Sequence, residues 1–359
     1  MNQKWPRMVF LFAILGLFLF KNNILWAQKQ HTSSTRGPLL ESEVVAPIAE
    51  VKVIAILEKD DLGKNLSFPT ALGYDPVRDE LYVIDAARSR IIIYTPDLFP
   101  VFSLGKGRGV LAPAGLTIDQ EGNIYLCQGT SAKDPRPHIS VFNAAAVKIK
   151  DIYFQGFEGA ENFSPKSIAL GIHGHIYVTG LDFEGVVVLN QKGHFIKIIA
   201  PKDSIIPNTP PKRALISDVY VDSKGRLYLL SEEMGRVYVY DDREHYLFKA
   251  GRKGGSSGKL SRPRGVCADP KRGLIYVIDY MRHTGLAFDY KTGKLRFEFG
   301  GRGWSPGWFN YPTDIIVDKF GRVYIADLFN HRVQVVELVE KGMPSVPITT
   351  TPSFITPLK

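Results

Sequence analysis

The chain has 359 residues, of which 45% are hydrophobic and 23% are charged. This balance excludes an intrinsically disordered chain, and a body of this length buries enough surface to fold without disulfide bonds. The formal net charge of +9 favours contact with anionic partners, such as acidic proteins, glycans or surfaces.

The first 27 residues form a separate unit. Lys4 and Arg7 precede an uninterrupted apolar run over residues 8–20, and Ala27 offers a small residue for cleavage, an order typical of a secretory signal peptide. As a helix the run covers about 20 Å, short of the roughly 30 Å hydrocarbon core of a bilayer. We therefore expect a cleaved signal and an extracytoplasmic body, periplasmic or secreted. The alternative is a body anchored to the inner membrane by this N-terminal segment.

One sequence unit recurs six times along the body. Each copy contains a tyrosine between two apolar residues, and these tyrosines lie 43 to 52 residues apart: Tyr82, Tyr125, Tyr177, Tyr228, Tyr276 and Tyr324. In most copies a proline precedes the tyrosine by twelve or thirteen residues, and an apolar strand that ends in aspartate lies between them. Two further strands follow, separated by turn residues. Four-stranded units repeated at this spacing predict a β-propeller.

The last unit has no fourth strand of its own, because the prolines of residues 341–359 cannot continue a strand ladder. An apolar segment without a partner, residues 51–57, lies upstream of the first unit. We therefore predict an all-β, six-bladed β-propeller over residues 49–340, closed by pairing of this segment with residues 332–338. Residues 28–48 are then a polar linker, and residues 341–359 a Pro/Thr-rich disordered tail.

The sixth unit carries the motifs by which a repeat family can be recognised, namely Gly300–Gly303, Phe309–Pro312, Val323–Asp327 and Asn330–Val335. It resembles an NHL repeat, and the fifth and first units resemble it too. The second, third and fourth units depart from the pattern at the aspartate after the tyrosine, where they have Gln128, Gly180 and Ser231. The resemblance covers about residues 50–340 and implies a six-bladed propeller. It leaves function open, because related propellers serve as binding platforms and only some are enzymes.

Charged residues stand where the predicted inner strands begin, at the mouth of the central channel: Lys166, Asp218, Arg264 and Asp314. Six-bladed lactonase-like enzymes carry carboxylates on these strands around a divalent cation. A metal-dependent hydrolase or lyase with a channel-bound Ca²⁺ or Zn²⁺ is therefore the alternative function. However, the neighbouring lysine and arginine would repel a metal and neutralise the acids. We expect a charge-balanced mouth with no catalytic residue, metal ligand or cofactor.

Cations gather in the predicted bends between blades, all on one face of the disc. They are Lys106, Arg108, Arg252, Lys253, Lys259, Arg262 and Arg302, with Arg264 just after a bend, and Trp304 and Trp308 stand in the last bend. Few acids lie in these bends, so we expect Arg252, Lys253 and Arg262 to be solvent-exposed. Aromatic residues beside cations suit an interface. We predict a monomeric, non-enzymatic scaffold that presents this face to an anionic protein, glycan or surface component rather than nucleic acid; a merely solvated basic face is the alternative.

Two further pairs of residues test the blade assignment. Asp327 and Arg332 lie five residues apart across the turn between the second and third strands, as do their counterparts in the first unit, and we predict an ion pair there. Cys127 and Cys267 fall on the second and fifth blades, on opposite sides of the ring. A disulfide requires Cα atoms within about 7 Å, so both are predicted to be buried free thiols.

Overall fold

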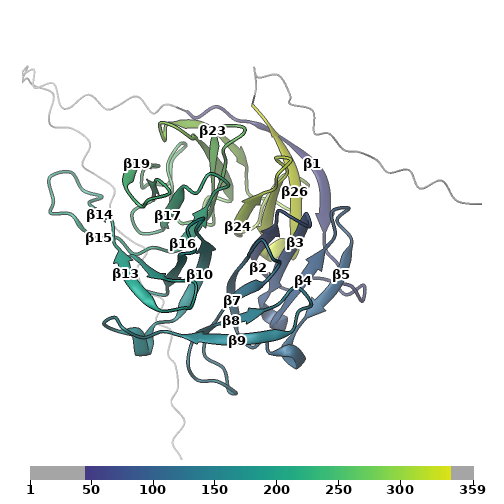
Figure 1. Cartoon of the computed structure of the whole chain (residues 1–359). Helices are drawn as coiled ribbons and strands as arrows, with labels where there is room; N and C mark the ends of the chain where they lie inside the picture. Colours follow the sequence, from purple (N-terminus) through teal and green to yellow (C-terminus); the bar gives the residue numbers. More distant parts are fainter. Residues whose placement is uncertain (1–44, 341–359) are drawn as a thin grey trace, which may run out of the picture. The chain divides into compact units, whose positions relative to one another are not determined.

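The tyrosine-centred unit folds six times as a four-stranded antiparallel sheet, and the six sheets form a six-bladed β-propeller (Figure 1). The computed structural model describes residues 45–340. The predicted signal peptide, residues 28–44 of the predicted linker and the predicted tail from residue 341 lie outside this range. Within residues 45–340, no helix is long and apolar enough to cross a membrane.

In the first five blades, the chain lays down four strands in order from the channel outward. Blade 1 contains β2 (Pro69–Asp75), β3 (Glu80–Asp85), β4 (Arg90–Tyr94) and β5 (Pro100–Leu104). Blade 2 contains β6 (Pro113–Ile118), β7 (Ile124–Gln128), β8 (His138–Phe142) and β9 (Lys148–Tyr153). Blade 3 contains β10 (Pro165–Leu170), β11 (Ile176–Gly180), β12 (Val186–Leu189) and β13 (Phe195–Ile199).

The remaining blades follow the same order, except that the last takes its outer strand from the N-terminal side. Blade 4 contains β16 (Asp218–Val221), β17 (Leu227–Ser231), β18 (Arg236–Tyr240) and β19 (Tyr246–Ala250). Blade 5 contains β20 (Pro263–Asp269), β21 (Leu274–Asp279), β22 (Thr284–Asp289) and β23 (Leu295–Gly300). Blade 6 contains β24 (Pro312–Val317), β25 (Val323–Asp327), β26 (Arg332–Val339) and β1 (Glu50–Leu57).

Short elements occupy some of the connections. A two-stranded hairpin, β14 (Lys202–Asp203) and β15 (Lys212–Arg213), lies in the bend between blades 3 and 4 and was not predicted from the sequence. Four single 3₁₀ turns complete the described chain: η1 (Ala86–Arg88), η2 (Lys106–Arg108), η3 (Ala160–Asn162) and η4 (Leu328–Asn330). The longest of these bends, between blades 3 and 4, spans residues 200–217 and contains the β14–β15 hairpin.

The repeated tyrosine and the repeated aspartate form one structural device. The Tyr228 hydroxyl donates to Asp222 at 2.9 Å, and the Tyr324 hydroxyl donates to Asp318 at 3.0 Å. Both tyrosine rings are buried in the blades, where a hydroxyl without a partner would destabilise the fold. In blades 4 and 6 the aspartate after the inner strand therefore supplies the acceptor for the buried tyrosine, whereas Tyr82 donates to Glu80 and Tyr177 to Glu244.

The hydrophobic core is divided into six clusters, each lying between two successive blades. The cluster between the sixth and first blades includes Leu57, Leu72 and Val333. Because every blade packs against two others, an open ring would expose two apolar faces to water. The fold consequently depends on closure of the ring.

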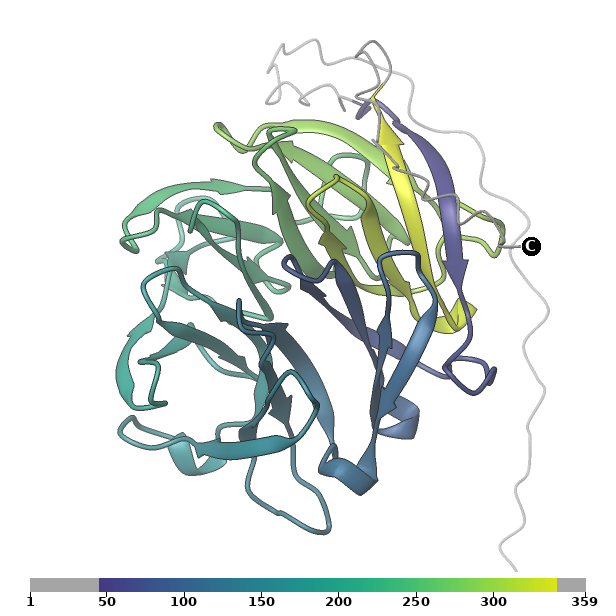
Figure 2. The same cartoon turned by 45° about the vertical axis from the view of Figure 1, so that its right-hand side comes forward.

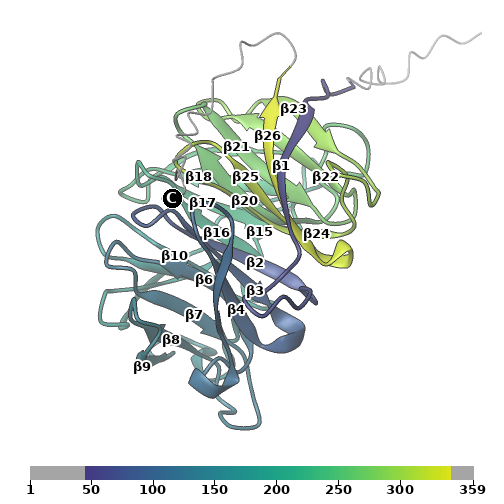
Figure 3. The same ribbon diagram turned by 90° about the vertical axis from the view of Figure 1, so that its right-hand side faces the viewer.

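Closure is achieved as predicted. Strand β1 pairs antiparallel with β26, with Val53 opposite Val336 and Leu57 opposite Val333, and Figures 2 and 3 show the purple β1 beside the yellow β26. The preceding residues extend the contact to blade 5, because Glu298 of β23 accepts from the Ala49 N–H at 2.8 Å. The segment before the first repeat thus fastens two blades, not one.

Both cysteines lie inside separate blades as free, buried thiols, as predicted. Cys127 belongs to β7 of the second blade and Cys267 to β20 of the fifth. Burial raises the pKa of each thiol, so neither is a ready nucleophile.

Candidate functional site

In four blades, the side chain of the residue that ends the second strand holds the bend before the blade. Asp85 accepts hydrogen bonds from the backbone N–H groups of Ser67 and Phe68, at 3.1 and 2.9 Å. In the second blade Gln128 takes this role and accepts from the Leu111 N–H at 2.7 Å. Since strands within a blade are antiparallel, these bends and the turns between second and third strands lie on one face. We call it the loop face.

The predicted ion pairs across these turns are present. Arg90 Nη2 lies 2.9 Å from Asp85 in the first blade, and Arg332 Nε lies 2.9 Å from Asp327 in the sixth. Both carboxylates are fully buried. The paired aspartates also hold the bends, so these residues organise the loop face and are not available as catalytic groups.

The bend between blades 5 and 6 is also held by hydrogen bonds from side chains of blade 6. Arg332 donates from Nη2 to the Trp308 carbonyl oxygen at 3.1 Å, and Gln334 donates from Nε2 to the same oxygen at 2.7 Å. Asn330 donates from Nδ2 to the Gly303 carbonyl oxygen at 2.9 Å. We call residues 301–309 the tryptophan loop. Its backbone is fixed by three side chains of the sixth blade.

Two large aromatic side chains project from this fixed backbone. Trp304 is 76% exposed and Trp308 is 50% exposed, and Arg302 beside them is exposed as well. Holding so much aromatic surface in water forgoes the stabilisation that burial would give. Exposed aromatic surface on an anchored backbone makes the tryptophan loop a candidate site for binding.

A row of aromatic rings that sequence reasoning missed crosses the loop face from blade 5 to blade 1. The ring centroids of Tyr280 and Tyr311 lie 4.8 Å apart, those of Tyr311 and Phe329 5.3 Å, and those of Phe329 and Phe68 5.9 Å. The Arg264 guanidinium lies 4.9 Å above the Tyr280 ring at one end of the row. These spacings are those of favourable aromatic pairs and a cation–π contact. The row connects the loop face with the channel mouth.

The predicted basic face is partly neutralised by an acid that lies outside the bends, and one of the three cations expected to be exposed is not. Arg262 Nε lies 2.6 Å from Glu232, and Arg264 Nε lies 3.1 Å from the other oxygen of the same carboxylate. Lys253 is half-buried rather than exposed, since its ammonium donates to the carbonyl oxygens of Glu232 and Ser261, at 2.8 and 2.7 Å. Few acids lie in the bends themselves, but Glu232 belongs to the turn between β17 and β18. That turn reaches the same face.

The other predicted cations are more accessible. Lys106, Arg108, Arg252 and Arg302 are exposed, and Lys259 is half-buried. The Arg108 guanidinium lies 5.1 Å above the Phe102 ring. Among residues 45–340, neither Lys106 nor Arg302 has an ion-pair partner. These two cations therefore remain available to an external anion.

The inner strands of all six blades line a central cavity of about 1020 Å³. It brings together Lys166, Asp218, Arg264 and Asp314, the four residues that were placed at the channel mouth from the sequence. The volume is sufficient for a small-molecule ligand. The channel is thus a second candidate site, separate from the tryptophan loop.

The two channel carboxylates connect neighbouring blades. Asp218 accepts from the Ser167 hydroxyl at 2.6 Å on one side and from the Val266 N–H at 2.9 Å on the other. Asp314 accepts from the Leu72 N–H at 2.7 Å. Their oxygens are engaged by donors that belong to the protein. Both carboxylates therefore connect the inner strands of neighbouring blades.

The same surroundings determine how these acids ionise. Burial raises the pKa of Asp218, and burial together with the nearby charge of Asp218 raises the pKa of Asp314 well above its usual range. Among residues 45–340, no group of three or more His, Cys, Asp or Glu side chains is placed to hold a metal ion. Zinc and calcium sites require at least three or four protein donors, so this donor set does not fit either metal.

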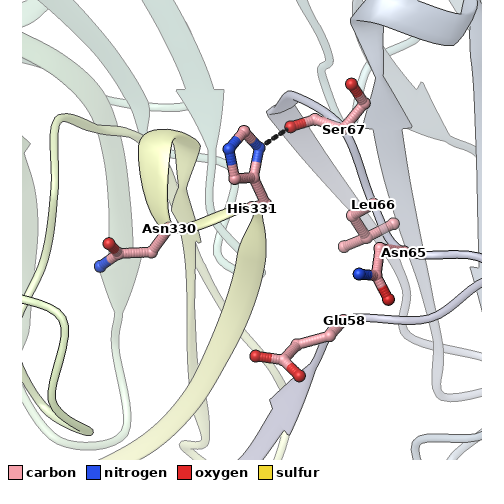
Figure 4. A pocket seen from close by; sticks show the side chains of 6 residues that line it. All are labelled: Glu58, Asn65, Leu66, Ser67, Asn330 and His331. Atoms are coloured by element: carbon pink, nitrogen blue, oxygen red, sulfur yellow. Dashed lines mark hydrogen bonds between the residues drawn. The ribbon is translucent and has the colours of Figure 1, made fainter.

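A smaller pocket of about 350 Å³ lies at the joint between blades 6 and 1 (Figure 4). Its walls include Glu58, Asn65 and Ser67 on one side and His331 on the other. The His331 ring points to the Ser67 carbonyl oxygen and donates to it from Nδ1, while Asn330 is turned away. This contact joins the two blades, so the side chains here have a structural role.

No protein-family model matches the chain. Over 103 residues it is 32% identical to NHL repeat-containing protein 2 of Gallus gallus, and over 104 residues 33% identical to the protein of that name in Homo sapiens. Each match covers 26% of this chain and 14% of the relative. The chain therefore spans a small part of the length of these curated relatives.

Solved structures share the fold over 81% of this chain. An auxiliary nutrient binding protein from Bacteroides ovatus has a TM-score of 0.58 at 17% identity, with 76% of that chain covered. A gluconolactonase from Xanthomonas campestris has a TM-score of 0.55 at 14% identity (90% covered), and virginiamycin B lyase from Staphylococcus aureus 0.51 at 13% (100% covered). Binding proteins and enzymes both occur on this fold. From its six repeats, its closed ring and these similarities, the chain is an NHL-type six-bladed β-propeller.

Proposed function

We propose that the chain is an exported, non-enzymatic binding propeller that holds an acidic protein on its loop face, with the tryptophan loop at the centre of the contact. The observation that carries the proposal is the exposure of Trp304 and Trp308 on a backbone fixed by Arg332, Gln334 and Asn330. Tryptophan, tyrosine and arginine dominate the binding energy of protein interfaces. A fixed loop also reduces the entropy lost on binding.

The charge of the loop face indicates the chemistry of the partner. Lys106 and Arg302 are exposed without an ion-pair partner in the described part of the chain, and Arg108 is exposed nearby in sequence. Cations at the rim of an interface accelerate association with an acidic surface and make binding weaken with salt. Export is supported by the apolar run of residues 8–20, which has the form of a secretory signal.

The channel hydrolase or lyase considered from the sequence receives less support. Its acids, Asp218 and Asp314, accept hydrogen bonds from three groups on neighbouring blades. Their raised pKa values also disfavour the ionised form that binds a metal. A loop-face interface uses exposed groups, whereas a channel metal site would have to displace structural contacts.

The test is capture of exported proteins on the immobilised, purified chain at low salt, with the captured protein then titrated against variants. We expect the double variant Trp304→Ala/Trp308→Ala to bind the captured protein at least tenfold more weakly, and Arg302→Glu to weaken it and reduce its salt dependence. The matched control is Phe99→Ala/Tyr246→Ala, which removes two exposed aromatics beside turns of the opposite face.

Two results would overturn the proposal. One is equal binding by the tryptophan variant and the control, which would show that the loop is not the contact. The other is capture that survives protease treatment of the partner but is lost after glycosidase treatment, which would identify a glycan as the ligand.

A further inference from the structure

The channel mouth contains one charged side chain for which the structure supplies no partner. Lys166 is half-buried and lines the 1020 Å³ cavity, yet among residues 45–340 its ammonium group makes no hydrogen bond and no ion pair. Its charged neighbours are engaged elsewhere, Arg264 with Glu232 and the two aspartates with groups of adjacent blades. The cavity is therefore lined by a cation that has no direct partner within the described residues, with Asp218, Glu232 and Asp314 as the opposite charges that act on it from further away.

Keeping this lysine is unfavourable for the fold. Burial and the positive charge of Arg264 lower the pKa of Lys166, while Asp218, Glu232 and Asp314 act more weakly in the opposite direction. A charge removed from water without a partner destabilises the folded state. Charged groups in such surroundings are characteristic of functional sites.

We propose that the channel mouth binds a small organic monocarboxylate, whose carboxylate group pairs with the Lys166 ammonium. The position of Lys166 in the ring supports this assignment. It follows the repeat proline Pro165, as Thr70 follows Pro69 and Arg264 follows Pro263, so these side chains occupy the same level of the channel. The Thr70 hydroxyl is buried without a hydrogen-bond partner and lines the same cavity. It offers a donor for a polar group of the ligand.

The balance of charge selects a carboxylate rather than a phosphate dianion. The Arg264 charge is compensated by Glu232, which leaves Lys166 as the cation without a contact. The oxygens of Asp218 and Asp314 are occupied by donors of the protein, so neither acid offers a free acceptor to a ligand. Lys166 alone among the cations named at the channel mouth therefore has no direct partner within residues 45–340, which suits a ligand with a single negative charge. This site does not depend on the loop-face interface proposed above.

The test uses the purified full chain and three simple carboxylates, acetate, lactate and benzoate, each compared with its uncharged amide and with inorganic phosphate. Isothermal titration calorimetry measures binding to the unmodified protein, to Lys166→Met and to Lys271→Met. Lys271 lines the same cavity at the other end of an inner strand, and its ammonium already donates to the Lys319 carbonyl oxygen at 3.0 Å. It is therefore a matched control for loss of a lysine in the channel.

We expect at least one carboxylate to bind more tightly than its amide and more tightly than phosphate. Lys166→Met should weaken that binding at least tenfold, whereas Lys271→Met should leave it unchanged. Thermal unfolding without ligand provides an independent measurement, because removal of a cation without a partner should keep or raise the melting temperature.

Three results would overturn the proposal. Amides or phosphate that bind as well as the carboxylates would exclude carboxylate recognition. Equal losses in both lysine variants would show a general charge effect. A lower melting temperature for Lys166→Met would show that this ammonium is needed to compensate Asp218 and Asp314, and that its role is structural.

Discussion

Asp314 on the inner strand of blade 6 accepts a hydrogen bond from the backbone N–H of Leu72 on the inner strand of blade 1, with 2.7 Å between Oδ2 and N. This contact joins the two blades at the channel, while the pairing of β1 with β26 completes blade 6 at the periphery. The two residues are 242 positions apart in the sequence. Ring closure therefore has an inner and an outer component.

Two replacements of Asp314 distinguish the contribution of its hydrogen bond from that of its charge. Asp314→Ala leaves the Leu72 N–H without an acceptor, and we expect a loss of about 1–3 kcal/mol in the free energy of unfolding. Asp314→Asn retains an oxygen that can accept this bond, so the loss should be smaller. Urea unfolding at pH 7 measures both. An equal loss in the two variants would contradict a role for the hydrogen bond.

The pH dependence of stability tests the charge of the same carboxyl. Burial raises the pKa of Asp314, so between the unfolded pKa near 3.9 and the higher folded value the native state binds more protons than the unfolded state. Stability contributed by this group therefore falls as the pH rises through that interval. The stability of Asp314→Asn relative to the unmodified protein should increase between pH 4 and pH 7. Urea unfolding at several pH values measures the difference, and a constant difference would contradict the raised pKa.

The fold could be predicted from the sequence because the signals for each blade lie close together within one repeat. Each unit contains its tyrosine and its turn residues, and all but one its proline, within about fifty positions, and strand periodicity determines the rest. The pairing of β1 with β26 was predictable because the sixth unit has no fourth strand of its own, and the apolar segment before the first unit has no partner strand. The ion pair of Asp327 with Arg332 was also predictable, because both residues flank a single turn.

The site was less predictable because it is assembled between blades. Glu232 forms ion pairs with Arg262 and Arg264, although it belongs to a turn thirty positions before Arg262. No local sequence pattern indicates that these two loops meet. The aromatic row gave a weak signal: Tyr311 and Phe68 each stand directly before a repeat proline, where the bends meet the inner strands. Comparison of that position across the six units would have drawn attention to them.

The outer part of the ring closure predicts a sharp boundary for truncation. A chain that begins at Ala46 keeps the contact with blade 5 and all of β1, so its melting temperature should match that of a chain with the preceding residues. A chain that begins at Lys59 loses β1, whose ladder hydrogen bonds contribute about 0.5–1.5 kcal/mol each, and exposes the face of β26. Several such bonds approach the whole stability of a typical domain, so this chain should unfold or aggregate. Equal melting temperatures by calorimetry would contradict closure through β1.

The link between Arg332 and the tryptophan loop can be tested with a reporter already in the sequence. In a chain that begins at Ala46, Trp304 and Trp308 are the only tryptophans, so their fluorescence reports the tryptophan loop alone. Arg332→Met removes a buried ion pair and the support of the Trp308 carbonyl, and we expect easier acrylamide quenching and lower fluorescence anisotropy. Breaking the pair should also lower the free energy of unfolding by about 3–5 kcal/mol.

The matched control for this variant is Arg90→Met in blade 1. It breaks the equivalent ion pair with Asp85 together with a second pair to Asp60, in a bend that carries no tryptophan. A comparable loss of stability with unchanged tryptophan quenching is expected, because the two blades share the ion pair but only the sixth uses its arginine to hold the tryptophan loop. If both variants change the quenching equally, the loop responds to the stability of the whole ring. If neither does, Gln334 and Asn330 suffice to fix the loop, and the preorganisation of Trp304 and Trp308 does not depend on Arg332.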